Sequence, residues 1–217
     1  MKEKTDPDRK PPQERGRGHA PVFRRPPAGN EAQTMKLNHI WGHFKTITTH
    51  KWLVMKNCFR IGLYRQGLLH DLSKYGWTEF STGVRYYQGN RSPNAAEREE
   101  KGYSAAWLHH KGRNRHHLEY WMDVSPKGKE AGMVGVKMPL NYVMEMMMDR
   151  IAASKVYRGK DYTDGSSWEY FCRSKEYLLM HPETRALVER LLLMLRDQGE
   201  AATFSYIRQE VLGKKHK

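Results

Sequence analysis

A histidine and an aspartate stand side by side in the stretch 68-LLHDLSKYG-76, at the end of an apolar run. Neighbouring side chains on a helix point about 100° apart, so an ordinary amphipathic surface gives no reason for this pair. One interpretation is a helix end, where Asp71 caps the following turn and His70 binds a carbonyl group. The other is a metal site, because imidazoles and carboxylates are both ligands of divalent ions.

Further candidate ligands lie in three other parts of the chain. Steps of four and seven residues put three histidines on one stripe of the first helical segment, namely His39, His43 and His50. The stretch 109-HHKGRNRHH-117 supplies four more. Asp149 stands within an apolar helix, where a buried carboxylate needs a cation or hydrogen-bond donors. Together these groups form a nitrogen and oxygen ligand set suited to Mn, Fe, Co, Ni or Zn.

The order of these residues along the chain resembles the HD-domain superfamily of metal-dependent phosphohydrolases. The matching positions are His50, the stretch 70-HDLSK-74, His110, the pair 116-HH-117 and Asp149. The stretches 106-AWLHHKGRNRHHLEYW-121 and 139-PLNYVMEMMMDR-150 are also similar to a small uncharacterised bacterial and phage family related to that core. Some of its members carry an automatic catalase label, for which this sequence gives no support because nothing in it resembles a haem catalase.

The resemblance implies an all-α, HD-domain-like helical bundle around one or two divalent transition metal ions, over about residues 37–157. The implied metal ligands are His50, His70, Asp71, His110, one of His116 and His117, and Asp149. The resemblance also implies that Lys74 approaches a substrate phosphate. Leu72 and Ser73 depart from the hydrophobic residue and glycine of many members, but they leave Lys74 in register.

Some of these assignments involve a choice between neighbouring histidines. His50 is favoured among the three histidines of the first helix, because its 20-residue interval to His70 suits two antiparallel helices joined by a short turn. His110 is favoured over His109, which points about 100° away on the same helix. The sequence does not separate the two histidines at 116–117.

Charged residues near these ligands are candidates for catalysis and substrate binding. Glu145 precedes Asp149 by four residues on one helical face, as a general base, as a group that supports a ligand, or as an exposed charge. A lysine or arginine would offset the negative charge that develops on a phosphate during transfer. The catalytic candidates are Lys74, Asp71 and Glu145, and the substrate-binding candidates are Lys74, Arg113 and Arg115.

These residues predict a phosphohydrolase that acts through metal-activated water on a small anionic substrate, a phosphate ester such as a nucleotide. Two alternatives remain. One is an HD-type dinuclear iron oxygenase, because four histidines and two aspartates also resemble enzymes such as myo-inositol oxygenase. The other is a catalytically silent basic bundle that binds nucleic acid. The formal net charge is +14, but residues 1–30 hold +4 and the last four residues +3, which leaves +7 for the rest.

Composition predicts one helical domain over residues 34–213 between two basic tails. Residues 1–33 are rich in Pro, Gly, Arg and Lys and poor in large apolar residues, which predicts a disordered tail, and residues 214–217 form the second. No apolar run reaches 18 residues, the N-terminus lacks a signal-peptide pattern, and Cys58 and Cys172 each stand alone. We therefore expect a cytoplasmic protein without a membrane span.

Helical periodicity without an alternating strand pattern predicts an all-α domain. The metal core is expected over about residues 37–157 and the C-terminal helices over 167–212. The expected helices cover residues 37–58, 58–71, a short segment from Thr78, 103–110, 139–157, 168–180, 182–198 and 200–212. A polar loop with at most one helical turn is expected over residues 90–102, and a Gly- and Pro-rich connection over 123–139.

Overall fold

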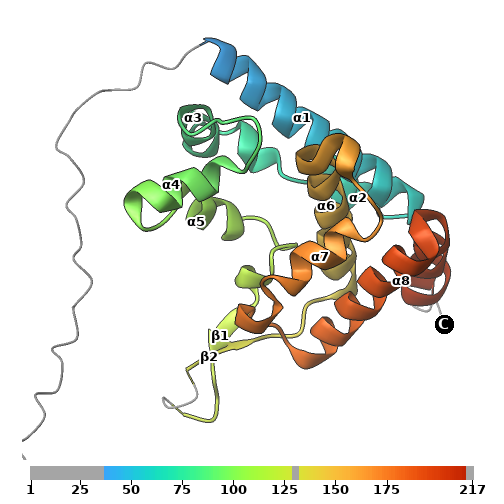
Figure 1. Ribbon diagram of the computed structural model, residues 1–217. Coiled ribbons are helices and arrows are strands. Elements are labelled where there is room, and N and C mark those ends of the chain that lie inside the picture. The colour runs from blue at the N-terminus through green and yellow to red at the C-terminus, as the bar shows by residue number, and fades with distance from the viewer. Residues whose placement is uncertain (1–36, 129–131, 214–217) are drawn as a thin grey trace, which may run out of the picture. The chain divides into compact units, whose positions relative to one another are not determined.

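A computed structural model of the chain describes residues 37–128 and 132–213 (Figure 1). The predicted tails, 1–33 and 214–217, lie outside the described residues. The described part is mostly α-helical, as predicted, and its helices are α1 (Leu37–Arg60), α2 (Tyr64–Leu69), α3 (Trp77–Arg85), α4 (Pro93–Lys101), α5 (Ala105–Lys111), α6 (Leu140–Arg158), α7 (Ser166–Cys172) and α8 (Pro182–Tyr206). The short turns are η1 (Leu72–Tyr75), η2 (Leu118–Tyr120), η4 (Gly159–Asp161), η5 (Lys175–Tyr177) and η6 (Ile207–Leu212).

α1 and α6 pack side by side and carry much of the core (Figure 1). Pro139 precedes the first turn of α6, where its missing N–H leaves no helical hydrogen bond unmade. The four methionines of 144-MEMMM-148 are all buried, so that this run fills the core with flexible side chains. The buried face of α1 meets them with residues that include Val54 and Cys58. Two long, well-packed helices thus provide a rigid support for the polar residues that they carry.

α7 and α8 pack beside α6 and complete the core with Phe171 and the leucines of α8. Pro182 occupies the first turn of α8, where the helix expected from residue 182 begins. The expected break between two C-terminal helices is a kink at Gly199, whose φ of 79° only glycine adopts readily. The helix expected over residues 168–180 is shorter than predicted, because α7 ends at Cys172 and only the single turn η5 follows.

Two expectations about connections are wrong. The predicted loop over residues 90–102 contains the nine-residue helix α4, which opens at Pro93 and is fastened by buried Glu97, whose carboxylate accepts a hydrogen bond of 2.7 Å from Ser104 Oγ. The connection over residues 123–139 includes a small antiparallel hairpin of β1 (Met122–Val124) and β2 (Met133–Gly135). Three-residue strands are too short to show alternation in a sequence. Within the described ranges, no helix is both long and apolar enough to cross a membrane.

Candidate metal centre

The turn after α2 directs His70 and Asp71 into one site. Asp71 adopts the left-handed conformation, with φ 53° and ψ 28°, and is the one non-glycine residue with positive φ in residues 37–128 and 132–213. This conformation costs roughly 1 kcal/mol even for an aspartate. The Asp71 side chain makes no capping hydrogen bond, and its Oδ2 lies 3.2 Å from His70 Nε2. The helix-cap interpretation of this pair is therefore wrong.

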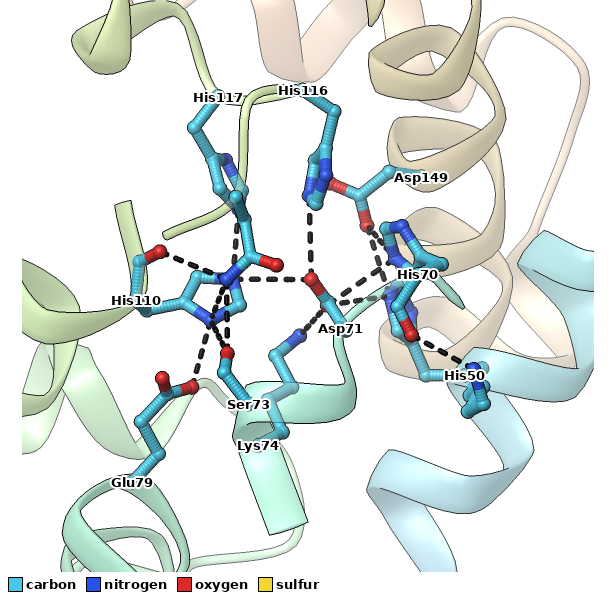
Figure 2. A network of polar contacts seen from close by, with 12 residues as sticks. His50, His70, Asp71, Ser73, Lys74, Glu79, His110, His116, His117 and Asp149 are labelled. Atoms are coloured by element: carbon cyan, nitrogen blue, oxygen red, sulfur yellow. Dashed lines mark hydrogen bonds and ion pairs between the residues drawn. The ribbon is translucent and has the colours of Figure 1, made fainter. Parts of the chain in front are cut away.

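Two other helices add candidate ligands on one side of Asp71 (Figure 2). His50 of α1 has its Nε2 atom 2.9 Å from Oδ1 of Asp149 on α6. His70 Nε2 lies 3.7 Å from the same Asp149 oxygen. With Asp71, these residues offer two imidazole nitrogens and two carboxylate oxygens within 4.8 Å of one another. One metal ion can be held by four such atoms.

Two histidines from the segment after α4 face the other oxygen of Asp71, and a third lies beside them (Figure 2). His110, at the end of α5, and His116 place their Nε2 atoms 3.3 Å and 3.4 Å from Asp71 Oδ1. His117 Nε2 lies 2.8 Å from His110 Nε2. These three histidines and Asp71 form a second group with the same close spacing. Both histidines at 116–117 therefore lie at the cluster, and Asp71 belongs to both groups.

Several buried atoms of this cluster lack a well-aligned hydrogen bond. They are Nε2 of His50, His70 and His116, and both carboxylate oxygens of Asp71. Even the 2.9 Å contact between His50 and Asp149 is not aligned as a hydrogen bond. Of these atoms, Asp71 Oδ2 also has the Lys74 ammonium beside it. A buried polar atom that stays unsatisfied costs about 1–3 kcal/mol. Divalent cations bound in the two groups would satisfy these atoms, so the residues present fit a metal site.

Glu145 holds two of the imidazoles from the side opposite their free nitrogens. Its Oε1 atom lies 3.0 Å from Nδ1 of His70 and 3.1 Å from Nδ1 of His116. Burial raises the pKa of Glu145, but hydrogen bonds from His116 and His70 outweigh burial and lower it. A carboxylate on Nδ1 fixes the ring so that Nε2 can bind a metal. Among the expected roles of Glu145, the geometry favours support of the ligands over general-base catalysis.

Glu79 of α3 supports His110 in the same way, although nothing in the sequence analysis pointed to it. Glu79 Oε2 lies 2.7 Å from His110 Nδ1, and Oε1 lies 2.7 Å from His109 Nδ1. Burial raises the pKa of Glu79, but hydrogen bonds from His110 and His109 outweigh burial and lower it. No fixed sequence spacing links a supporting carboxylate to its histidine, so the one available signal was weak: an acid on a half-apolar helix.

The carboxylates of the cluster are ionised beside a protonated imidazole. Burial lowers the pKa of His70, but the charges of Asp71, Glu145 and Asp149 outweigh burial and raise it to about 9. Burial raises the pKa of Asp71, yet the charges of His70 and Lys74 outweigh burial and hold it well below its usual range. Burial also raises the pKa of Asp149, yet the contact with His50 and the charge of His70 outweigh burial and hold it well below its usual range. A metal ion would take the place of the proton on His70, since ligands must be deprotonated to bind it.

The other predicted site residues divide into one that reaches the cluster and two that do not. Lys74 forms an ion pair with Oδ2 of Asp71. Arg113 is exposed and donates a hydrogen bond to the backbone carbonyl of His109. The Arg115 guanidinium lies over the Tyr120 ring, 5.6 Å from its centre. The structure therefore brings neither Arg113 nor Arg115 to the cluster.

The two histidines on the first turns of α1 also lie away from the cluster. His43 packs against the Phe80 ring at 5.3 Å, and His39 against the Tyr87 ring at 5.9 Å. Burial, and to a lesser extent the charge of Lys74, lowers the pKa of His43 to about 4. His43 is thus a neutral core residue, and His50 is the histidine of α1 that faces the ligand groups.

Fold and cluster together define a mostly α-helical protein in which α1, the α2–η1 turn, the end of α5, the turn before η2 and α6 converge on one buried histidine and aspartate site. A family model described as a family of unknown function, DUF5662, matches residues 39–194. This match covers well over half of the chain, so the chain belongs to DUF5662. The matched range includes all residues of both ligand groups. Neither the curated proteins nor the solved structures contain a match to this chain.

Proposed function

We propose that this protein is a metal-dependent phosphohydrolase that binds two divalent transition metal ions and hydrolyses a phosphate ester. The observation that carries the proposal is the membership of Asp71 in both four-residue ligand groups. One carboxylate shared by two ions would hold them close together, as two-metal phosphoryl transfer requires. The resemblance of the sequence to HD-domain phosphohydrolases supports the same reaction class.

In such a site, the position of each side chain determines whether it binds a metal ion or holds a ligand in place. One group binds through His50, His70, Asp71 and Asp149, and the other through Asp71, His110, His116 and His117. Glu145 and Glu79 hold the Nδ1 sides of their histidines and so keep Nε2 directed at the centre. When bound, ions of this class lower the pKa of water towards neutrality and polarise a phosphoryl oxygen.

Lys74 is the group best placed to meet the anionic substrate. Its ammonium contacts Asp71 and its side chain is 28% exposed, so that it lies between the ligands and solvent. Burial lowers the pKa of Lys74, but Asp71 and Asp149 outweigh burial and raise it, so that the lysine stays protonated. A cation bound to Asp71 would compete with this ion pair and leave the lysine charge available to a phosphate oxygen.

The test measures metal content and phosphate release on the same preparations. Protein purified without added metal should contain about two transition metal ions per chain and should release phosphate from members of a nucleotide panel. The Asp149→Ala variant should lose both properties, because one ligand group loses a charged donor. The matched control is Asp161→Ala, an exposed aspartate just beyond α6, which should keep both. Wild-type metal content in Asp149→Ala would contradict the proposed site.

The composition of the cluster favours one alternative reaction. Its five histidines and two aspartates contain the four-histidine, two-aspartate set that a dinuclear iron oxygenase of HD type requires. The two candidates differ in metal and co-substrate. Bound iron with oxygen consumption and no phosphate release would support the oxygenase, whereas Mn, Co, Ni or Zn with phosphate release would support the hydrolase.

A further inference from the structure

α1 carries an apolar stripe on the face opposite its buried residues. The stripe occupies positions 37, 41, 44, 48, 52, 55 and 59, which lie within about 80° of one another on a regular helix. Thr48 is its one polar residue, and the others are Leu37, Trp41, Phe44, Trp52, Met55 and Phe59. Trp41 is 67% exposed and Trp52 59% exposed. Since the opposite face of α1 packs in the core, this stripe gives the helix large apolar side chains on its exposed side as well.

α2 and η1 extend this stripe sideways. The ring centres of Phe44 and Tyr75 are 6.1 Å apart, and those of Phe59 and Tyr64 are 5.2 Å apart. Three large apolar side chains on these segments are also exposed, namely Tyr64, Leu68 and Leu72, and the Tyr64 ring is the one in contact with the stripe. We name the whole surface the α1 face, made of Leu37, Trp41, Phe44, Trp52, Phe59, Tyr64, Leu68 and Leu72.

The α1 face has the area of one half of a stable protein interface. Its eight side chains are on average about half exposed, which corresponds to about 800 Å² of apolar surface for residues of this size. The largest apolar patch on a monomer is about 300–600 Å², and a standard interface buries about 800 Å² on each partner. A patch of this area on an isolated chain therefore points to a partner that covers it.

The spacing of the stripe has the symmetry that self-association needs. Counted from Leu37, the steps are 4, 3, 4, 4, 3 and 4 residues, which read the same in both directions around Thr48. A two-fold axis near Thr48 would place the large side chains of two antiparallel copies of α1 opposite one another: Leu37 with Phe59 of the partner subunit, Trp41 with Met55 of the partner subunit, and Phe44 with Trp52 of the partner subunit. A two-fold interface requires such a self-complementary pattern.

The charges beside the stripe predict how the contact responds to salt. α1 contains no acidic residue, and Lys45 and Lys56 stand exposed along one edge of the stripe. Lys51, on the other edge, is held by the backbone carbonyls of Leu68 and His70 at 2.8 Å and 2.9 Å. Two copies would bring the free lysines of both chains to one edge, where salt screens their repulsion over about 8 Å. Salt should therefore strengthen self-association, whereas it would weaken binding of an acidic partner.

We propose that the α1 face is the interface of a two-fold symmetric homodimer in which α1 packs antiparallel against α1 of a second copy of this chain. The contact is independent of the proposed metal chemistry, because His50 lies on the buried face of α1. The dimer should accordingly form in Asp149→Ala as well as in the unaltered protein. Failure of the metal proposal would leave this interface unaffected, and the reverse also holds.

Sedimentation velocity over a hundredfold range of full-length protein concentration tests the interface. The unaltered protein should approach twice the mass of the chain, more readily at higher salt. Trp41→Glu and Trp52→Glu should each sediment as monomers with an unchanged helical circular dichroism spectrum, since both side chains are exposed. Tyr177→Glu changes an aromatic residue that is 86% exposed outside the α1 face, and it should leave the dimer intact. A monomer at every concentration, or a dimer that both tryptophan variants preserve, would overturn the proposal.

A cysteine at the axis tests the antiparallel register. In a Cys172→Ser background, which leaves only buried Cys58 among the native cysteines, Thr48→Cys should form an intermolecular disulfide when copper phenanthroline accepts the two electrons of the thiols. Thr49→Cys, one residue along but about 100° around the helix and exposed, should form far less. Equal cross-linking of the two variants, or none in Thr48→Cys while the protein is dimeric, would exclude this register.

Discussion

Oε1 of Glu145 lies 3.0 Å from Nδ1 of His70, so that a carboxylate on α6 orients the imidazole at the end of α2. The same oxygen lies 3.1 Å from Nδ1 of His116, which belongs to the other ligand group. One side chain therefore fixes a ligand on each side of Asp71. A carboxylate in this position acts on metal affinity through the histidines that it holds.

We predict that Glu145→Gln lowers the affinity for metal by about 10–100-fold while the fold is kept. The amide removes the charge that stabilises both Nδ1–H groups, but it keeps the volume of the side chain. Competition against a coloured chelator measures the affinity. Glu176→Gln is the control, because this glutamate is 77% exposed and its ion-pair partner is Lys175, which is not a residue of the cluster. Unchanged affinity in Glu145→Gln would show that the two histidines need no such support.

Lys74→Met should retain metal and lose turnover. The lysine contacts Asp71 but is not a ligand, so its removal frees the carboxylate and leaves both ligand groups complete. Loss of one positive group that meets a transferring phosphate should lower kcat by about 100-fold. Metal content and kcat measured together separate the two effects, and Lys56→Met, an exposed lysine of α1, supplies the control. A Lys74→Met protein without metal would show that the lysine serves the site structurally.

His109→Ala and His110→Ala should differ sharply although the residues are adjacent. His110 directs Nε2 at Asp71, whereas His109 only shares the Glu79 carboxylate with it. His110→Ala should therefore lower the number of metal ions bound per chain, and His109→Ala should leave that number unchanged, because Glu79 still holds His110. Elemental analysis of the two variants decides the matter. Equal losses would mean that the Glu79 bridge acts as one unit with both histidines.

The residues of the cluster were predictable from the sequence because their types and order point to one kind of chemistry. A histidine beside an aspartate, a second aspartate inside an apolar helix and a cluster of four histidines have few structural explanations. The structure brings His50, His70, Asp71, His110 and Asp149 together, and their role as metal ligands stays a prediction. The helices around them were predictable from apolar periodicity. The left-handed turn at Asp71, which makes the adjacent pair converge, left no trace in the residue types.

Two functional or structural acids could not be predicted from the sequence, because their roles depend on where the folded chain places them. Glu79 lies on a half-apolar helix and Glu97 on a polar one, and only tertiary packing turns both acids into buried acceptors. Conversely, Arg113 and Arg115 had suitable charge and position in the sequence, but their side chains turn to a backbone carbonyl and to the Tyr120 ring. Long flexible side chains take directions that sequence spacing does not specify.

His43 should make the protein less stable as the pH falls from 6.5 to 4. Burial, assisted by Lys74, lowers the pKa of His43 from 6.5 to about 4, so that the unfolded chain binds a proton more readily than the folded chain in this window. His43 should therefore lower the free energy of unfolding by about 2 kcal/mol at pH 5, and by almost nothing above pH 7.5. Urea unfolding of His43→Leu and of the unaltered protein, each at pH 5 and at pH 7.5, isolates the contribution of His43 to the free energy of unfolding.

The difference between His43→Leu and the unaltered protein should therefore shift in favour of the variant by about 2 kcal/mol on acidification. Ile47→Val, a core change one turn along α1 that removes no titratable group, should cost the same at both pH values. If the His43→Leu difference is independent of pH, the imidazole is protonated as readily in the folded chain as in the unfolded one. That result would mean that water or an anionic partner reaches His43, and the packing of its ring against Phe80 would then not exclude the charged form.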